Sequence, residues 1–152
     1  MSSGGITPVD FPFRDAQIAH IVDSVADSLR ITDINYGNHL GNDSMVSVLH
    51  EARVQWLHTK GYTELDIEGT SLILSALHVD FCGESFYGDK LLISLMPGEL
   101  TRSGFELYYQ VEGIRGNEKI LIAKARTDMV FFEYNSRRVM PMPEAVRQWL
   151  SP

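Results

Sequence analysis

The sequence has one cysteine, few cations and no long apolar run, and each scarcity excludes a class of protein. A single cysteine, Cys82, allows no disulfide within the chain. The 13 lysines and arginines face 20 acidic residues, which leaves a formal charge of −7, whereas nucleic-acid binding requires a positive surface. No apolar stretch approaches the roughly 20 residues needed to cross a bilayer. We therefore expect neither nucleic-acid binding nor a membrane span.

Motifs for nucleotide phosphates, zinc and export are also missing. No Gly-x-x-x-x-Gly-Lys-Ser/Thr pattern occurs, so the sequence predicts no nucleoside triphosphate chemistry. The segment from His50 to Val54 begins like a zinc-binding His-Glu-x-x-His helix, but Val54 stands where the second histidine is needed. The first residues do not resemble a signal peptide, because no charged stretch precedes an apolar one. We expect a cytoplasmic protein.

The remaining composition is that of one globular domain. A chain of 152 residues that is 44% hydrophobic and 22% charged can bury a sizeable core. Residues 1–23 are expected to form an N-terminal extension that packs on the body, because Pro8 and Pro12 keep their neighbours out of a helix. Residues 24–152 are expected to form a single domain.

Polar chemistry is concentrated between Thr32 and Asp43, followed by an apolar-periodic run. The residues of this segment that carry chemistry are Asp33, Asn35, His39, Asn42 and Asp43. Side chains at 42–44 suit the start of a helix, which we predict over residues 43–60 with a stop at Lys60-Gly61. The apolar stripe of this helix is Met45, Val48, Leu49, Ala52 and Trp56.

The start of this helix is a candidate oxyanion site. Free backbone N–H groups carry partial positive charge there and can hold a carbonyl oxygen as it becomes negative. We place these N–H groups around Leu40, Gly41, Asn42 and Asp43.

Strand-like runs dominate the rest of the chain. Alternating apolar residues and intervening glycine turns predict strands over residues 71–81, 90–100, 104–114 and 119–133. A further strand is favoured over residues 24–32, and residues 15–23 suit either a short helix or an earlier part of that strand. Residues 143–150 are expected to dock as a short helix.

Several segments together carry a family resemblance. They are Asp33 to Asn42, Glu51-Ala52-Arg53, Gly88-Asp89, Ala123 to Thr127, and Arg138 to Pro143. In this order and spacing, residues 25–150 resemble the acyl-CoA thioesterases of the 4-hydroxybenzoyl-CoA thioesterase class. The fold class is α+β, and the expected architecture is a hot-dog fold, in which a five-stranded antiparallel sheet wraps a long central helix.

The resemblance implies hydrolysis of an acyl-CoA or acyl-carrier thioester by water, without a metal or nucleotide cofactor. Coenzyme A enters only as part of the substrate. In relatives the loop before the helix reads Asp-x-Asp, and its second Asp acts as base or nucleophile; Asn35 matches that position here. His39 and Asn42 match positions that follow in plant acyl-carrier thioesterases. Neutral Asn35 cannot accept a proton, although it can orient a water, so another carboxylate is required.

Glu51 and Asp33 are the two candidate bases. Glu51 lies in the predicted helix, and its alternative role is an ion pair with Arg53 or with a neighbouring subunit. Asp33 equally suits hydrogen bonds to nearby backbone N–H groups. His39 suits catalysis or ordering of the loop, and Cys82 is expected to be a small buried residue rather than a nucleophile.

Partners follow from the same resemblance. Arg102, Arg137 and Arg138 fall at turns or strand ends and are candidates for binding the phosphates of coenzyme A, with solvated surface arginines as the alternative. In the resembled families two subunits join their sheets, and the acyl site lies between one helix start and the partner's strands. We expect a homodimer or homotetramer, since free strand edges need protection. An acyl-CoA-binding or dehydratase-like protein is the alternative function.

Overall fold

The computed structural model describes residues 18–21, 34–35, 39–40, 42–83 and 90–151. Within these, side chains are described from Met45 onwards, apart from Arg115. The strand predicted over residues 24–32 and the candidates Asp33 and Gly41 lie outside the described residues. The domain boundary expected at residue 24 stays a prediction.

One long helix, α2, spans Asn42–His58. It begins one residue before the predicted start and ends two residues before the predicted end. All five residues of the predicted apolar stripe are buried. Gly61 has the left-handed φ of +77° that the stop signal anticipated, and its N–H donates to the carbonyl of His58 at 2.9 Å.

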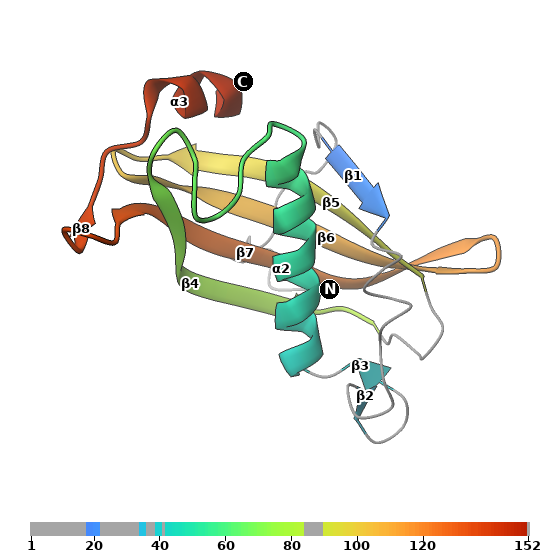
Figure 1. Ribbon diagram of the computed structural model, residues 1–152. Coiled ribbons are helices and arrows are strands. Elements are labelled where there is room, and N and C mark those ends of the chain that lie inside the picture. The colour runs from blue at the N-terminus through green and yellow to red at the C-terminus, as the bar shows by residue number, and fades with distance from the viewer. Residues whose placement is uncertain (1–17, 22–33, 36–38, 41, 84–89, 152) are drawn as a thin grey trace.

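The four predicted long strands are present to within one residue at each end. They are β4 (Ser71–Phe81), β5 (Lys90–Leu100), β6 (Gly104–Arg115) and β7 (Glu118–Glu133). With β1 (Ile18–Ile21) they form an antiparallel sheet in the order β1-β5-β6-β7-β4, which confirms the predicted five-stranded sheet (Figure 1). Of the two alternatives for residues 15–23, residues 18–21 adopt the strand. The two-residue strand β8 (Arg138–Val139), which was not predicted, pairs with the end of β7.

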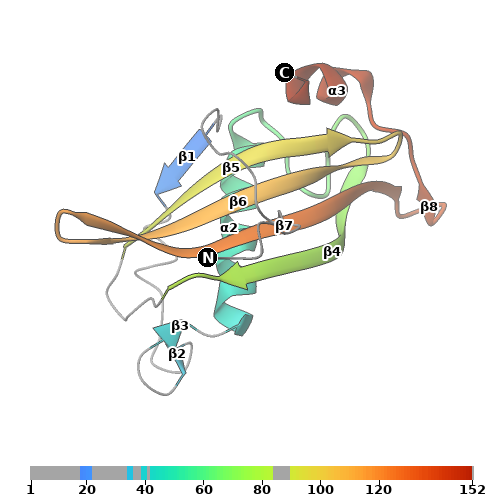
Figure 2. The ribbon, with the colours of Figure 1, turned by 180° about the vertical axis from the view of Figure 1, so that it is seen from behind.

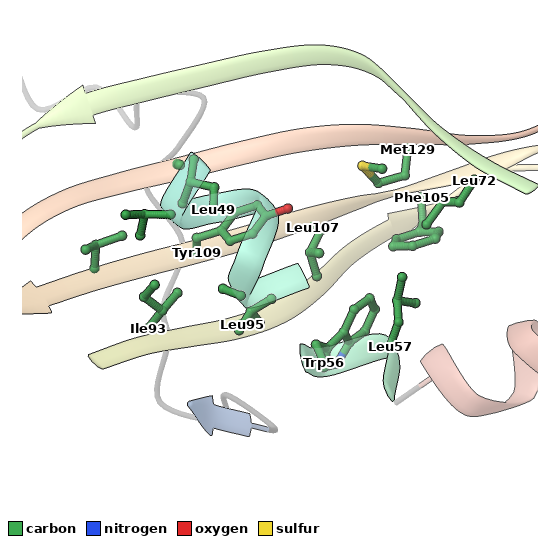
Figure 3. Packing of buried hydrophobic residues seen from close by; sticks show 14 of the residues in the cluster. Leu49, Trp56, Leu57, Leu72, Ile93, Leu95, Phe105, Leu107, Tyr109 and Met129 are labelled. Atoms are coloured by element: carbon green, nitrogen blue, oxygen red, sulfur yellow. The ribbon is translucent and has the colours of Figure 1, made fainter. Parts of the chain in front are cut away.

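Helix α2 lies across one face of this sheet (Figures 1 and 2). The alternation in β6 holds, since Phe105, Leu107, Tyr109 and Val111 are buried and face the helix. Figure 3 shows the resulting contact between side chains of α2 and side chains of β5 and β6. This packing positions the start of α2 at the edge of the sheet formed by β4 (Figure 1).

The C-terminal helix α3 (Glu144–Leu150) closes one end of the core, as the prediction for residues 143–150 anticipated. Val146 and Leu150 are buried, and the Trp149 ring stacks on Trp56 with 4.7 Å between ring centroids. Arg147 Nη2 donates to the carbonyl of Thr101 at 2.7 Å. No helix in the described part of the chain is long and apolar enough to cross a membrane.

Candidate functional site

A small two-stranded ribbon leads into α2. Strands β2 (Ile34–Asn35) and β3 (His39–Leu40) pair antiparallel, with Asn35 opposite His39 and Ile34 opposite Leu40. Helix α2 begins at Asn42, two residues after the ribbon ends. The fold therefore brings three predicted site residues, Asn35, His39 and Asn42, to one end of the helix.

The start of α2 has the chemistry that an oxyanion requires. The first N–H groups of a helix have no carbonyl partner one turn earlier, and they carry the positive end of the helix dipole. Asn42 and Asp43 are the first two residues of α2. A carbonyl oxygen placed there would meet donors already in position, so the oxyanion hypothesis stays a prediction with a defined location.

Glu51 is partly buried on α2 and has one hydrogen-bond partner among the described residues. Gln55 Nε2 donates to Glu51 Oε2 at 3.2 Å. The alternative role of Glu51 as the ion-pair partner of Arg53 is wrong, because Arg53 Nε bonds Glu64 Oε2 at 2.6 Å instead. On a helix, residues two apart point to opposite sides, which separates Glu51 from Arg53.

Distance along the helix limits what Glu51 can do. Glu51 comes nine residues after Asn42, and a rise of 1.5 Å per residue places it about 13 Å from the helix start. A glutamate side chain cannot span that distance to a carbonyl bound at the start of its own helix. Within one chain, the oxyanion site and the candidate base are therefore two separate places.

Beneath α2 lies a polar network that the sequence did not predict. Arg53 is 5% exposed, and its Nη1 donates to the Tyr109 hydroxyl of β6 at 3.0 Å. That hydroxyl also lies 2.7 Å from Thr127 Oγ1 of β7. The network thus joins α2 to two strands and, through Glu64, to the turn that precedes β4.

At Arg53 and Tyr109, burial and the neighbouring side chains shift the pKa in opposite directions. Burial would lower the pKa of Arg53, but the nearby Tyr109 and Glu64 outweigh it, so the pKa of Arg53 is raised. Burial raises the pKa of the Tyr109 hydroxyl, although Arg53 and Thr127 act in the opposite direction. Arg53 therefore stays charged and Tyr109 stays neutral, which suits a structural role for this pair.

One end of the network reaches the surface at His50. His50 Nδ1 lies 3.3 Å from Glu64 Oε1 and 3.1 Å from Arg53 Nη2. The His50 side chain is 53% exposed, whereas that of Arg53 is 6% exposed. No sequence pattern predicts this contact, because Glu64 lies beyond the end of α2 and the turn at Gly61.

The predicted phosphate-binding arginines lie elsewhere. Arg102 follows β5, Arg137 has a φ of +55° and Arg138 begins β8; all three are exposed. The N–H of Met142 bonds the Arg102 carbonyl at 2.8 Å, which places these arginines at one end of the sheet. The ribbon β2–β3 lies at the opposite end (Figures 1 and 2). One chain does not bring the arginines and the ribbon together.

Two further expectations concern Cys82 and metals. Cys82 is exposed rather than buried, so that expectation is wrong; the residue lies just past the end of β4, and its N–H donates to the Ile122 carbonyl of β7 at 2.7 Å. Among the described residues, no group of three or more histidine, cysteine or acidic side chains is placed to hold a metal ion.

Comparison with known proteins identifies the family. Residues 29–150 match the model of the thioesterase-like superfamily. The chain is 32% identical over 110 residues to a 1,4-dihydroxy-2-naphthoyl-CoA hydrolase from Nostoc punctiforme, covering 70% of this chain and 72% of the relative. It is 29% identical over 129 residues to the hydrolase of that name from Rippkaea orientalis, covering 81% and 91%. The chain belongs to the thioesterase-like superfamily.

Solved structures support the fold. A 1,4-dihydroxy-2-naphthoyl-CoA thioesterase from Synechocystis is similar at a TM-score of 0.69 and 21% identity, covering 80% of this chain and 90% of that one. A 4-hydroxybenzoyl-CoA thioesterase complexed with 4-hydroxybenzoyl-CoA is similar at a TM-score of 0.72 and 17% identity, covering 88% and 96%. The predicted hot-dog fold and the thioesterase family are confirmed.

Proposed function

We propose that this protein hydrolyses the thioester of an aromatic acyl-CoA to the free acid and coenzyme A. Thioester hydrolysis follows from the superfamily and from relatives that are named hydrolases of a CoA thioester. The observation that carries the aromatic substrate is the 32% identity to the Nostoc punctiforme enzyme, whose name specifies 1,4-dihydroxy-2-naphthoyl-CoA. The 4-hydroxybenzoyl class, whose member shares the fold, supplies the second acyl group to test.

The proposed mechanism divides catalysis between a helix start and a carboxylate. The thioester oxygen binds the free N–H groups near Leu40 to Asp43, and the neighbouring Asn35 orients the attacking water. Glu51 takes a proton from that water as it adds to the carbonyl carbon. The carbon–sulfur bond then breaks, and the thiolate of coenzyme A leaves. The reaction needs water but no metal or organic cofactor.

The reach of Glu51 makes a second copy of the chain part of this proposal. Glu51 lies about 13 Å from the start of its own helix, so the base must act on a thioester bound at the helix start of a partner. The terminal strand β4 offers an edge for joining two sheets, and Leu74 and Phe81 of this strand are exposed. Because the start of α2 lies near this edge, a dimer through β4 would bring each α2 beside the helix start of its partner. Such a dimer completes the sheet around the central helix. It also forms the acyl site between the two copies.

A dimer also offers a place for the cations. Arg102, Arg137 and Arg138 lie far from the ribbon of their own chain, so they can bind the phosphates of coenzyme A only at a site that a second copy helps to form. Sedimentation of the purified protein at micromolar concentration tests the dimer. A monomer that hydrolyses acyl-CoA at full rate would exclude the two-copy site. The cytoplasm remains the expected location.

The activity is tested by measuring thiol release from a panel of acyl-CoAs. We expect 1,4-dihydroxy-2-naphthoyl-CoA to give a higher kcat/KM than 4-hydroxybenzoyl-CoA and aliphatic acyl-CoAs. The reverse order would assign the protein to another class of acyl substrate, but its activity would still be that of a thioesterase. Absence of thiol release from every member would leave an acyl-CoA-binding protein.

The base is tested by substitution. Glu51→Gln keeps the shape of the side chain and its bond to Gln55 but removes the proton acceptor, so kcat should fall about 10²-fold with the melting temperature unchanged. Asp33→Asn tests the rival base. If Asp33→Asn abolishes turnover and Glu51→Gln does not, the base lies in the loop. Asn35→Asp restores the carboxylate of the resembled family, and a loss of rate in that variant would support a role for Asn35 as donor.

A further inference from the structure

His50 is distinguished from the other histidines whose side chains the structure describes by its contact with a carboxylate. His58 of the same helix and His78 of β4 are exposed, and neither forms an ion pair with the residues that the structure describes. We propose that His50, oriented by Glu64, protonates the departing thiolate of coenzyme A. This inference rests on the proposed hydrolysis and adds an acid to the site, opposite in role to Glu51.

The carboxylate of Glu64 is held firmly enough to orient a ring. Arg53 Nε donates to Glu64 Oε2 at 2.6 Å, and the Glu64 carbonyl accepts the N–H of Leu72 at 2.7 Å. The second oxygen, Oε1, lies 3.3 Å from His50 Nδ1. Nδ1 of His50 thus faces the Glu64 carboxylate within ion-pair distance and Arg53 within hydrogen-bond distance, which leaves Nε2 as the nitrogen that can exchange a proton with a bound molecule.

Arg53 makes this orientation sensitive to Glu64. Its Nη2 lies 3.1 Å from the same His50 nitrogen, but it can donate only when Nδ1 carries no proton. Glu64 and Arg53 thus favour opposite tautomers of the neutral ring. Replacing the Glu64 carboxylate by an amide removes the stronger acceptor and favours the tautomer in which Nδ1 is bare.

The His50 ring is accessible to a substrate. Its side chain is 53% exposed on α2. His50 comes eight residues after Asn42, or about 12 Å along the axis. It therefore has the same reach as Glu51, toward a thioester held at the helix start of a second copy.

Glu51 and His50 act in different steps of the proposed hydrolysis. In the first step the oxygen of water bonds to the carbonyl carbon, and the proton of that water passes to Glu51. In the second step the carbon–sulfur bond breaks, sulfur keeps the electron pair, and the proton on Nε2 of His50 passes to that sulfur. Solvent then removes the proton from Glu51 and returns one to His50, so the products are a carboxylic acid and a thiol.

The acidity of the leaving thiol tests this role. Benzoyl thioesters of N-acetylcysteamine and of thiophenol share the acyl group and both lack the nucleotide, but thiophenolate leaves without needing a proton. His50→Gln should lower kcat about 10²-fold on the alkyl thioester and much less on the aryl thioester. Glu64→Gln should show the same selective loss to a smaller extent, which a merely structural contact would not produce.

His58→Gln is the matched control, because His58 is an exposed histidine of the same helix without a carboxylate partner. It should change neither rate. Equal losses on both thioesters, or no loss in His50→Gln, would overturn the acid role while leaving the thioesterase intact. Failure of the parent protein to hydrolyse either thioester or any acyl-CoA would instead contradict the proposed function. Melting temperatures confirm that each variant folds.

Discussion

Two ion-paired arginines lie on opposite faces of the same sheet, and they are satisfied in different ways. Arg53 enters the helix side, where its side chain is 6% exposed and bonds one carboxylate and one hydroxyl. Arg126 of β7 lies on the other face at 17% exposed, 3.2 Å from Asp128 and 4.0 Å from Glu106. The inner arginine depends on exact donor geometry, whereas the outer one is more exposed and lies within 4.0 Å of two carboxylates. The degree of burial, rather than the number of neighbouring carboxylates, should decide which arginine contributes more to the free energy of unfolding.

The largest expected effect separates these two arginines directly. Arg53→Met should lower the free energy of unfolding by about 3–5 kcal/mol, because it leaves the Glu64 carboxylate without its guanidinium partner and removes one of the two hydrogen bonds of the buried Tyr109 hydroxyl. Arg126→Met should cost less than about 1 kcal/mol, and that cost should shrink as salt is added. Urea unfolding at low and high salt measures both. Equal losses in the two variants would contradict the comparison.

A smaller effect is expected for the tyrosines that accompany the arginines. Tyr109→Phe removes a hydroxyl that contacts both Arg53 and Thr127, and it should cost about 1–3 kcal/mol. Tyr108 is adjacent in sequence but faces the other side of the sheet, where its hydroxyl bonds Glu106 at 3.3 Å. Tyr108→Phe should therefore cost no more than about 1 kcal/mol by the same unfolding measurement. A larger loss for Tyr108→Phe would show that the outer face carries the stability.

How far the sequence alone predicts this molecule depends on the range of the interaction. The α2 stripe and the alternation of β6 repeat every few residues, so they could be read from neighbours alone. The pairing of β8 with β7 involves only two residues, too few to form a period. The same limit applies to the ribbon β2–β3, which places Asn35 opposite His39.

The polar contacts were beyond sequence reasoning for another reason. Arg53 and Glu64 are eleven residues apart and meet only because the chain reverses at Gly61. The sequence therefore offered Glu51 as the nearer partner for Arg53, and that prediction failed. Candidate residues in the loop were found because their types match a family, whereas the His50–Glu64 contact carries no motif.

The smallest expected effect concerns a third polar contact, on the turn after α2. The Tyr62 hydroxyl donates to Glu68 Oε2 at 2.6 Å, and this bond, followed by burial, raises the pKa of Tyr62 to about 12. Since the folded pKa lies above the ordinary value of 10.0, the contribution to stability is complete below pH 10 and is lost between pH 10 and about 12. Over that pH range, the melting temperature should fall slightly less for Tyr62→Phe than for the parent protein. If the melting temperatures of the variant and of the parent protein fall by the same amount, the hydrogen bond between Tyr62 and Glu68 contributes nothing to stability.

The strand β4 carries a bulge, because its register with β7 shifts between Leu74 and Ala76. Ser75, at the irregularity, donates its hydroxyl to the Asp128 carbonyl at 3.0 Å. A bulge bends a strand and interrupts its row of hydrogen-bonding groups. The edge that β4 presents is therefore divided into two short lengths, residues 71–74 and 76–81. A foreign strand cannot add along the whole edge without a break, which guards against runaway association of sheets, while the regularly paired length from Ala76 to Phe81 stays long enough for one matched partner.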